Sequence, residues 1–456
     1  MTTLSAFDAR PLVAQLEDVR AAYLADERPW VLGYSGGKDS TAALHLVWRA
    51  LEGVPRERRT KDVVVVASDT GVEAPMVTAR LDDSLACVER AARAAALPIR
   101  TCRVTPTLED SFWVNLIGKG YAAPSVKFRW CTERLKIRPT NRFIVEQVRA
   151  SGEVILILGS RRAESATRAQ VLALHRQKGG PFSRHSTLRG ALIYPPIEAW
   201  SDDDVWSYLL QDPCPWGGDH RDLVALYRGA RGGECPLVVD TRTSSCGGGR
   251  FGCWVCTVVE RDRSMEALVD AGADWMEPLL ALRDFLSSTQ DPARKRELRE
   301  TRRRNGRVKI ARDGGHVPGP YRLKVCRDVL RRVLEAQEAV RRTGPDPTMT
   351  LISDAELHEI RRVWREERHD WEDALPGLVR AATGRAFCLS LEDTPHFSAD
   401  DDAKLRAAGE RHGVPVELLR ALIDLERFAS PHEGSEAREG ALKQLLARDW
   451  WTSEDA

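Results

Sequence analysis

Long apolar runs are missing from this chain of 456 residues. Its most apolar stretches, Val63–Ala67 and Val154–Leu158, are far shorter than the roughly 20 residues that a membrane-spanning helix needs. The first twenty residues lack the apolar segment of a secretory leader, and they carry Asp8, Glu17 and Asp18. We therefore expect a cytoplasmic protein with no membrane partner.

An excess of charge of either sign is also missing, and cysteine is scarce. The 68 basic and 67 acidic residues give a net charge of +1, so a nucleic acid would have to bind a local basic patch. Ten cysteines are too few for a disulfide-stabilised fold of this length, and clustered cysteines in a reducing compartment indicate metal ligands or catalysts. With 43% hydrophobic and 30% charged residues, the composition is that of a globular protein of two or three domains.

Short β-rich runs alternate with longer helical patterns over the first 200 residues. The predicted strands are Trp30–Tyr34, Asp62–Ser68, Pro98–Val104 and Glu153–Gly159, and the predicted helices are Ser40–Leu51, Ala74–Ala96, Pro139–Ala150 and Ala163–Gln177. The run Val63–Val66 is apolar throughout, which is typical of a strand buried on both faces of a parallel sheet. The pattern predicts an α/β domain with a doubly wound parallel sheet, whose ligands bind at the carboxyl ends of the strands.

The composition changes twice after this domain. Residues 212–260 are rich in glycine, proline and cysteine, and from Met265 onward the pattern is helical and rich in arginine, glutamate and leucine. The sequence therefore predicts an α/β domain over residues 1–200, a cysteine-rich segment over 201–262 and a helical, partly basic region over 263–456.

The strongest local motif follows the first predicted strand and precedes a helix. It reads Ser35-Gly36-Gly37-Lys38-Asp39-Ser40-Thr41. Two glycines allow backbone N–H groups to approach a phosphate, the helix N-terminus adds positive potential, and Lys38 supplies a mobile cation. The motif is not a Walker A loop, because Leu32 replaces its first glycine and Asp39 follows the lysine. An ordinary glycine turn is the alternative.

This motif resembles the PP-loop of N-type ATP pyrophosphatases, which cleave ATP between the α and β phosphates. The resemblance implies ATP with Mg²⁺ as ligands of the loop. It makes Lys38 and Asp39 candidate catalytic residues, and it implies that the nucleotide is bound by Ser35, Gly36, Gly37, Ser40 and Thr41.

Two further strand ends carry polar motifs. Asp69 follows the second predicted strand, where the resembling family has a loop near the nucleotide, although a capped turn would also use this residue. The fourth strand ends in Gly159-Ser160-Arg161-Arg162-Ala163-Glu164-Ser165-Ala166-Thr167-Arg168, which resembles a motif of the phosphoadenosine-phosphosulfate reductase branch of PP-loop proteins. Arg161 and Arg168 match its basic positions and suit anionic oxygens; a helix start with solvated charges is the alternative.

Four cysteines cluster in the order Cys235-x10-Cys246-x6-Cys253-x2-Cys256. The glycines between them let the chain wrap a compact inorganic centre, and neighbouring aromatic side chains can shield it from water. Four thiolates with one CxxC pair fit either Zn²⁺ or a [4Fe–4S] cluster, and the spacing alone does not choose between them.

The order of these motifs is more specific than any one of them. The PP-loop is followed by Arg129–Ile137, by Gly159–Arg168 and then by the cysteines. Over residues 25–350 this order resembles the DndC-like sulfurtransferases of DNA phosphorothioation systems, with the SspD proteins as close relatives. The resemblance implies a [4Fe–4S] cluster on Cys235, Cys246, Cys253 and Cys256. It also implies DNA, a cysteine desulfurase and other phosphorothioation-system subunits as partners.

A fifth cysteine, Cys131, lies among cations at Arg129, Arg134 and Lys136. These cations and the N-terminus of the helix predicted from Pro139 would favour its thiolate, which is the better nucleophile and persulfide carrier. We therefore expect Cys131 to carry sulfur as a catalytic residue. The alternatives are a structural cysteine, or sulfur carried by the cluster itself.

Ten Lys or Arg residues against two Glu residues give a local charge of +8 between Arg294 and Arg312. Such a density of charge can follow a phosphate backbone, so we expect DNA to bind here. A solvated helix face is the alternative, but Gly306, Gly314 and Gly319 favour a loop.

Together the motifs predict ATP-dependent sulfur insertion into the DNA backbone through an adenylated phosphate, with AMP and pyrophosphate as products. Two other functions remain open. One is an adenylyl-sulfate reductase, although the Glu-Cys-Gly motif and the paired cysteines of those enzymes do not occur in this sequence. The other is a sensor that binds nucleotide, cluster and DNA without turnover, and pyrophosphate release would separate it from both enzymes.

Overall fold

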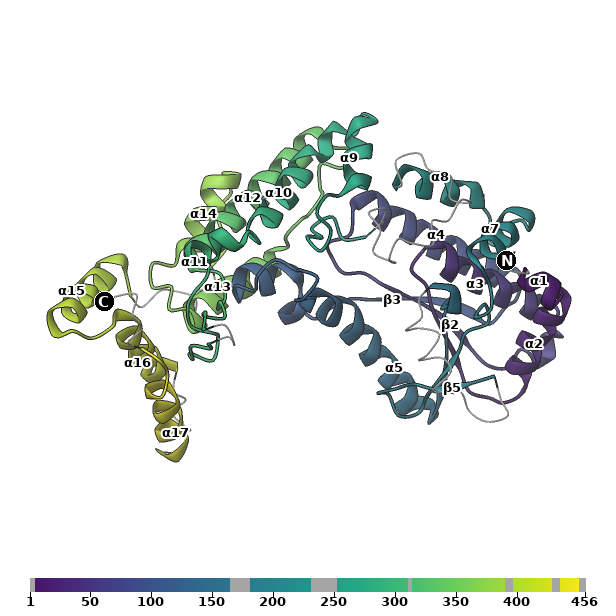
Figure 1. The fold of residues 1–456 in the computed structure, drawn as a ribbon, viewed down its shortest axis with the longest axis horizontal. Coiled ribbons are helices and arrows are strands. Elements are labelled where there is room, and N and C mark those ends of the chain that lie inside the picture. The colour runs from purple at the N-terminus through teal and green to yellow at the C-terminus, as the bar shows by residue number, and fades with distance from the viewer. Residues whose placement is uncertain are drawn as a thin grey trace. The chain divides into compact units, whose positions relative to one another are not determined.

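The chain forms two compact units in this computed structural model (Figure 1). The first comprises Met1–Thr107 and Arg129–Ala273, and the second comprises Leu108–Phe128 and Asp274–Ala456. The structure describes residues 5–164, 181–230, 252–310, 314–389, 397–428 and 435–450.

The limits of the units differ from the segments expected from the sequence, because residues 108–128 pack with helices that follow much later. Two buried indole groups fix this packing. The Trp113 indole N–H donates to the Leu351 carbonyl at 2.6 Å, and the Trp364 indole N–H donates to the Ile117 carbonyl at 2.9 Å. An early segment of the chain therefore belongs to the core of the second unit.

A six-stranded sheet forms the centre of the first unit. Its strands are β1 Trp30–Gly33, β2 Val63–Ser68, β3 Ile99–Val104, β4 Val154–Ile157, β5 Ser183–Arg184 and β6 Ala191–Tyr194, in the order β3-β2-β1-β4-β6-β5. Every neighbouring pair is parallel except β5 with β6. The predicted parallel sheet is confirmed, and the four predicted strands match β1 to β4; the short β5 and β6 were not predicted.

Helices cover both faces of this sheet. They are α1 Ala6–Ala9, α2 Leu12–Leu24, α3 Lys38–Glu52, α4 Pro75–Ala94, α5 Arg138–Ser151, α7 Asp202–Gln211, α8 His220–Ala230 and α9 Arg263–Asp270. On one face Val65 of β2 packs in a core that includes α3 and α4, and on the other Val64 packs with Ile144 of α5. Burial on both faces explains why β2 is apolar throughout. The helix expected over Ala163–Gln177 falls almost wholly outside the described residues.

The strand order places the candidate site. Counting from β1, the chain moves outward through β2 and β3 and then returns to the other side of β1 with β4. In sheets of this kind, ligands bind where the order reverses, outside the carboxyl ends of the two strands. The loops that follow Gly33 and Ile157 therefore meet at the expected binding crevice.

The second unit is helical, as the composition after residue 263 predicted. Its helices are α10 Glu277–Ser288, α11 Lys295–Leu298, α12 Leu323–Thr343, α13 Asp354–Glu367, α14 Ala374–Thr383, α15 Ala399–His412, α16 Val416–Phe428 and α17 Ser435–Leu446. A buried stripe along α12, with Val325, Val329, Val333 and Val340, holds this helix in the core. Within the described ranges, none of the helices is both long and apolar enough to cross a membrane.

Candidate nucleotide and thiol site

The loop between β1 and α3 ends on an open helix N-terminus. Gly36 has a φ of +70°, which residues with side chains disfavour, and Gly37 is the N-cap residue of α3. The N-cap residue has no side chain to cap this helix, and the acceptors at its first N–H groups are neutral hydroxyls: Ser35 Oγ accepts the Gly37 N–H at 3.4 Å and the Tyr227 hydroxyl accepts the Lys38 N–H at 3.3 Å. Ser35 Oγ and Ser40 Oγ lie 3.1 Å apart and hold the loop closed. The predicted phosphate loop thus has the form that binding of a phosphate requires.

Lys38 and Arg161 form a charge network with two carboxylates. Lys38 Nζ lies 3.0 Å from Asp39 Oδ1 and 2.9 Å from Asp202 Oδ1. Arg161 Nε lies 2.8 Å from Asp39 Oδ1, and the same guanidinium pairs with Asp202. Both cations are buried, so their charges depend on these carboxylates. The network joins the phosphate loop to the loop after β4.

Gly159, just after β4, allows these two loops to touch. A Cβ atom on Gly159 would lie 2.6 Å from the Asp39 carbonyl oxygen and 2.9 Å from the Ser40 nitrogen, which is closer than real Cβ atoms come. The backbone after β4 can therefore approach the start of α3 only because residue 159 is glycine. This approach places Arg161 beside Asp39.

Asp202 belongs to the site, although the sequence indicated only a role at a helix N-terminus. Of the acids that open α7, Asp204 forms the capping box, whereas Asp202 reaches the network. Burial alone would raise the pKa of the Asp202 carboxyl, but Lys38 and Arg161 outweigh burial and hold this pKa below its ordinary 3.8. An ion pair across more than 160 residues leaves no local signal in the sequence, so it could not be predicted.

The loop after β2 holds Asp69 in contacts of its own. Asp69 Oδ1 accepts the Gly71 N–H at 2.8 Å, and Asp69 Oδ2 pairs with Arg103 at 2.5 Å. Asp69 also lines the cavity beside the phosphate loop. Both of its carboxylate oxygens are therefore engaged, and its contact with a nucleotide stays a prediction.

Five cysteines line one cavity together with the phosphate loop, and three of them, Cys131, Cys253 and Cys256, belong to the predicted motifs. The cavity has a volume of about 980 Å³, and its wall includes Ser35–Gly37, Cys131, Cys253 and Cys256. Cys253 Sγ lies 3.3 Å from Thr70 Oγ1, and the Cys256 N–H donates to the Cys253 carbonyl at 3.0 Å. The structure thus brings the phosphate loop, the predicted sulfur carrier and two predicted cluster ligands to one site.

Three predicted site residues, Arg168, Cys235 and Cys246, lie outside the described residues. Among the residues that are described, no group of three or more possible ligands gathers closely enough to hold a metal ion. Cys253 and Cys256 nevertheless present two thiols at a cavity wall, and thiolates are the ligands that an iron–sulfur cluster requires. The described pair fits one side of such a centre, and the complete ligand set stays a prediction.

The environment of Cys131 differs from the expected one. Burial raises the pKa of the Cys131 thiol, and the charge of neighbouring Cys256 raises it further. The expectation of a favoured thiolate is therefore wrong in direction, and burial is the largest cause. The helix also begins earlier than expected: a π-helical turn over Thr132–Ile137 precedes α5, and hydrogen bonds from Thr132 oppose the rise in this pKa.

Other walls of the same cavity are apolar and aromatic. They include Tyr34, Leu81, Trp216 and Tyr227, and the Tyr227 hydroxyl accepts the Lys38 N–H at 3.3 Å. Aromatic faces and aliphatic side chains suit the stacking of a purine ring. Sequence analysis missed these residues, because they come from four separate segments and share no motif.

Comparison with known proteins identifies the type of domain. Residues 29–218 match the model of the phosphoadenosine phosphosulfate reductase domain. An uncharacterized protein of Methanocaldococcus jannaschii is 30% identical over 198 residues, which are 43% of this chain and 35% of that protein. An adenosine 5′-phosphosulfate reductase of Neisseria meningitidis is 32% identical over 125 residues, which are 27% of this chain and 45% of that enzyme. The chain thus spans less than half the length of these curated relatives.

Two solved structures show a distant likeness. A phosphoadenylyl-sulfate reductase from Candida auris is 14% identical with a TM-score of 0.29, covering 46% of this chain and 87% of that one. The U34-tRNA thiolase NcsA from Methanococcus maripaludis, solved with its [4Fe-4S] cluster, is 13% identical with a TM-score of 0.27, covering 50% of this chain and 76% of that one. Scores this low carry no argument about a site or an activity.

Proposed function

Because residues 29–218 carry a phosphoadenosine phosphosulfate reductase-like domain of PP-loop type, we propose that this protein spends ATP to activate a substrate oxygen and then replaces that oxygen with sulfur. One observation carries the proposal: the phosphate loop and the thiols of Cys131, Cys253 and Cys256 line a single cavity. Cys87 and Cys214 also line this cavity, and the proposal depends on the three cysteines that belong to the predicted motifs.

Different residues would bind the triphosphate, the purine and the metal ion of ATP. The triphosphate would lie on the open N-terminus of α3, with Lys38 beside it. The purine would stack among side chains such as Tyr34 and Trp216. The carboxylates nearest to the loop are those of Asp39 and Asp202, and they are our candidates to bind the Mg²⁺ that accompanies ATP.

The proposed reaction consists of two displacements. A phosphate oxygen of the substrate attacks the α-phosphorus of ATP, the bond to the β-phosphate breaks, and pyrophosphate leaves with the bonding electrons. A sulfur nucleophile then attacks the phosphorus of the substrate, and AMP leaves with the oxygen that sulfur replaces. Lys38 and the N–H groups at the start of α3 would stabilise charge on the phosphoryl oxygens in the first displacement.

The thiols would serve the second displacement. Burial keeps the Cys131 thiol protonated at neutral pH, so we expect Cys131 to act as a persulfide, which is more acidic than a thiol. A cysteine desulfurase would load this sulfur. Attack by the terminal sulfur of the persulfide joins Cys131 to the substrate phosphorus through an S–S bond. A thiol reductant would then cleave that S–S bond, so that one sulfur stays on the phosphorus and the Cys131 thiol is regenerated. A [4Fe–4S] cluster, which Cys235, Cys246, Cys253 and Cys256 would hold, supplies redox and sulfur chemistry when bound.

We propose DNA as the substrate and phosphorothioation of its backbone as the outcome. The order of motifs and the cysteine spacing, which resemble those of DndC-like sulfurtransferases, support this choice. The basic run from Arg294 to Arg312 concentrates positive charge that phosphates could meet in a chain whose net charge is only +1. The other subunits of a phosphorothioation system would be its partners.

An adenylyl-sulfate reductase is the second candidate, because residues 29–218 match a reductase domain and one relative is named as such an enzyme. The sequence lacks the Glu-Cys-Gly motif and the paired cysteines that such reductases use. A reductase would release sulfite from adenylyl sulfate without any need for ATP.

The test is the identity of the products. Full-length protein, prepared without oxygen, is incubated with α-labelled ATP, duplex or single-stranded DNA and a cysteine desulfurase. The proposal predicts labelled AMP and free pyrophosphate in amounts that depend on DNA. Labelled ADP as the main product would reject the proposal. Release of sulfite and AMP in a second incubation, with adenylyl sulfate and a thiol reductant in place of ATP, would also reject it if ATP is not turned over in the first.

A further inference from the structure

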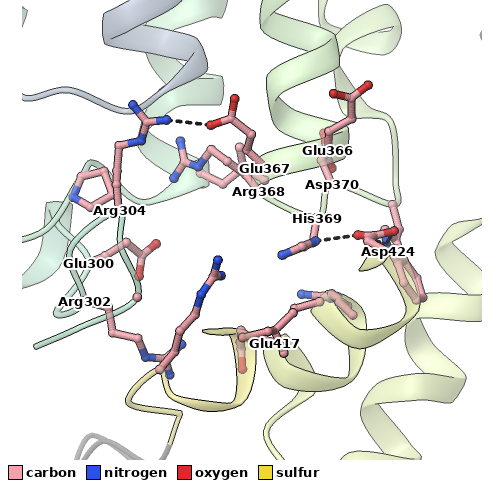
Figure 2. Close-up of a pocket in the computed structure, with 18 of the residues that line it drawn as sticks. Glu300, Arg302, Arg304, Glu366, Glu367, Arg368, His369, Asp370, Glu417 and Asp424 are labelled. Atoms are coloured by element: carbon pink, nitrogen blue, oxygen red, sulfur yellow. Dashed lines mark hydrogen bonds and ion pairs between the residues drawn. The ribbon is translucent and has the colours of Figure 1, made fainter. Parts of the chain in front are cut away.

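A second cavity, of about 1000 Å³, lies wholly within the second unit (Figure 2). Its walls come from residues 300–306, from residues 366–372 after α13, from α16 and from residues 448–450 near the end of the described chain. None of the steps proposed above uses it. Charged side chains dominate its lining, so the balance of their charges decides what it can bind.

Most carboxylates of this cavity already have cationic partners. The pairs are Glu367 with Arg304 at 2.7 Å, Asp370 with Arg327 at 2.6 Å, Glu372 with Arg327 at 2.8 Å, and Asp402 with Arg406 at 3.0 Å. Figure 2 shows the first of these pairs at one edge of the cavity. The two charges within each pair cancel, so the net charge of the cavity depends on the groups that are not paired.

Five cations of the lining have no carboxylate partner within the described parts of the chain. They are Arg302, Arg303, Lys324, Arg368 and Arg448. Arg368 donates to the Tyr321 carbonyl at 2.5 Å and contacts Cys326 Sγ at 3.0 Å, and neither neutral group cancels its charge. Burial lowers the pKa of the half-buried Arg448 guanidinium, with no nearby anion to offset it. Three acids of the lining, Glu300, Glu417 and Glu426, also lack a cationic partner within the described residues. Over the whole lining, twelve Lys or Arg residues face nine Asp or Glu residues, which leaves an excess of three positive charges.

His369 adds a hydrogen-bonding group with a fixed direction. Its φ of +54° is rare for a residue with a side chain, and its Nδ1 lies 2.5 Å from Asp424 Oδ2. Because an ionised carboxylate only accepts hydrogen bonds, this contact places the Nδ1 proton toward Asp424 and leaves Nε2 on the side of the open cavity (Figure 2). A ligand oxygen in the cavity would find a pre-oriented imidazole.

We propose that this cavity binds backbone phosphates of a nucleic-acid strand. Guanidinium and ammonium groups without anionic partners bind phosphates well, because each such contact releases a counterion condensed on the nucleic acid. The cations come from four separate segments: the loop at residues 300–306, the start of α12, the end of α13 and the residue pair that follows α17. Cations distributed in this way suit a row of phosphates better than one small anion.

The proposal also changes the meaning of the basic run. Within the described part of that run, Arg304 is paired with Glu367, and the half-buried Arg299 donates from Nε to the Gly319 carbonyl at 2.5 Å. Arg302 and Arg303 are the members that line the cavity without a carboxylate. The run is therefore one wall of a site that three later segments complete. The proposal rests on the proposed function only in its choice of DNA as the strand.

The experiment measures binding by full-length protein of a fluorescent 20-residue DNA strand of mixed sequence, by anisotropy over a range of salt concentrations. Arg303→Gln combined with Arg448→Gln should weaken binding about tenfold and lower the slope of log affinity against log salt by about one to two. Glu417→Gln removes an exposed acid of the lining and should strengthen binding. Arg342→Gln, which removes an exposed cation of α12 outside the cavity, is the matched control and should change neither quantity.

Two results would overturn the proposal. Unchanged affinity and salt slope in the double variant, with a thermal unfolding midpoint equal to that of the wild type, would show that the cavity does not meet the strand. Competition by inorganic pyrophosphate or AMP at concentrations that match the affinity for the strand would show a small-anion site instead. Phosphorothioate formation by the wild type is measured in parallel. If the double variant loses binding but the wild type makes no phosphorothioate, the proposed function is rejected and the cavity is not. If the wild type makes phosphorothioate but the double variant binds as the wild type does, the cavity is rejected and the proposed function is not.

Discussion

The Lys38 ammonium lies 2.9 Å from an Asp202 carboxylate oxygen, although the two residues belong to the start of α3 and the start of α7. This ion pair, together with Arg161, sets the position of the only lysine in the phosphate loop. A lysine held by a distant carboxylate has a defined place before it meets a phosphate. The pair therefore connects the local motif, which is visible in the sequence, to the tertiary structure that orients it.

Lys38→Ala should abolish most of the ATP turnover. We expect release of pyrophosphate to fall about 100-fold or more, because a preorganised cation on the transferring phosphoryl group is lost. Because Lys38 is buried and pairs with Asp39 and Asp202, the unfolding midpoint is measured in parallel, and the rate is compared at a temperature where the variant is folded. A rate close to that of the wild type would contradict the role of this loop.

Asp202→Asn tests whether Asp202 holds Lys38 in position for the reaction or only helps to bind ATP. Without the carboxylate, Lys38 keeps its charge and its pair with Asp39 but loses the partner on α7, so we expect kcat to fall more than KM for ATP rises. Asp203→Asn, an exposed acid on the same helical turn, is the control and should leave both constants unchanged. Equal effects of the two substitutions would mean that only the net charge near α7 matters.

Cys131→Ser should separate sulfur transfer from ATP cleavage. We expect this variant to keep its iron and its pyrophosphate release and to make no phosphorothioate, because the two displacements use different groups. Cys388→Ser, at an exposed cysteine of the second unit, is the control and should retain both activities. Normal incorporation of sulfur by Cys131→Ser would move the sulfur chemistry to the cluster.

Acid should destabilise the first unit through His45. Burial of this side chain on α3 lowers the pKa of its imidazole from 6.5 to about 3, and the nearby Asp212 only partly opposes this. The unfolded chain takes up the proton near pH 6.5, whereas the folded chain resists it until about pH 3. The stability that depends on neutral His45 is therefore complete above pH 6.5 and is lost as the pH falls toward 3.

His45→Gln tests this linkage. The variant should show a weaker fall of the unfolding midpoint between pH 6.5 and about pH 3 than the wild type, because the titrating group is gone. His412→Gln, at an exposed histidine that ends α15, should keep the slope of the wild type. Parallel curves for all three proteins would show that His45 does not control the acid response.

The parts of the fold that the sequence predicted are those with a strong local pattern. β2 was predictable because Val63–Val66 is buried on both faces, and the phosphate loop because its glycines must open a helix. β6 was missed because Ala191–Tyr194 is only four residues long and is followed directly by Pro195. Its place in the sheet comes from pairing with β4, which no local pattern encodes.

In the candidate site too, residues in local motifs were predicted and residues brought together by tertiary structure were missed. Motifs placed Lys38 and Arg161 at strand ends, and the structure brings both to one network. Asp202 was missed because its partners are far away in the chain. From its cationic neighbours in the sequence, the Cys131 thiol was expected to have a lowered pKa. Burial raises this pKa instead, and burial depends on the tertiary structure, which the local sequence does not show.

The central claim is the insertion of sulfur into the DNA backbone, and mass spectrometry of nuclease-digested DNA tests it most directly. DNA is taken from cells that carry the gene with its partner genes, from cells without the gene and from cells with the Lys38→Ala variant. If the protein inserts sulfur into DNA, phosphorothioate-linked dinucleotides occur in the first sample only. Phosphorothioate in all three samples, or in none of them while the purified protein still releases pyrophosphate from ATP, would contradict it.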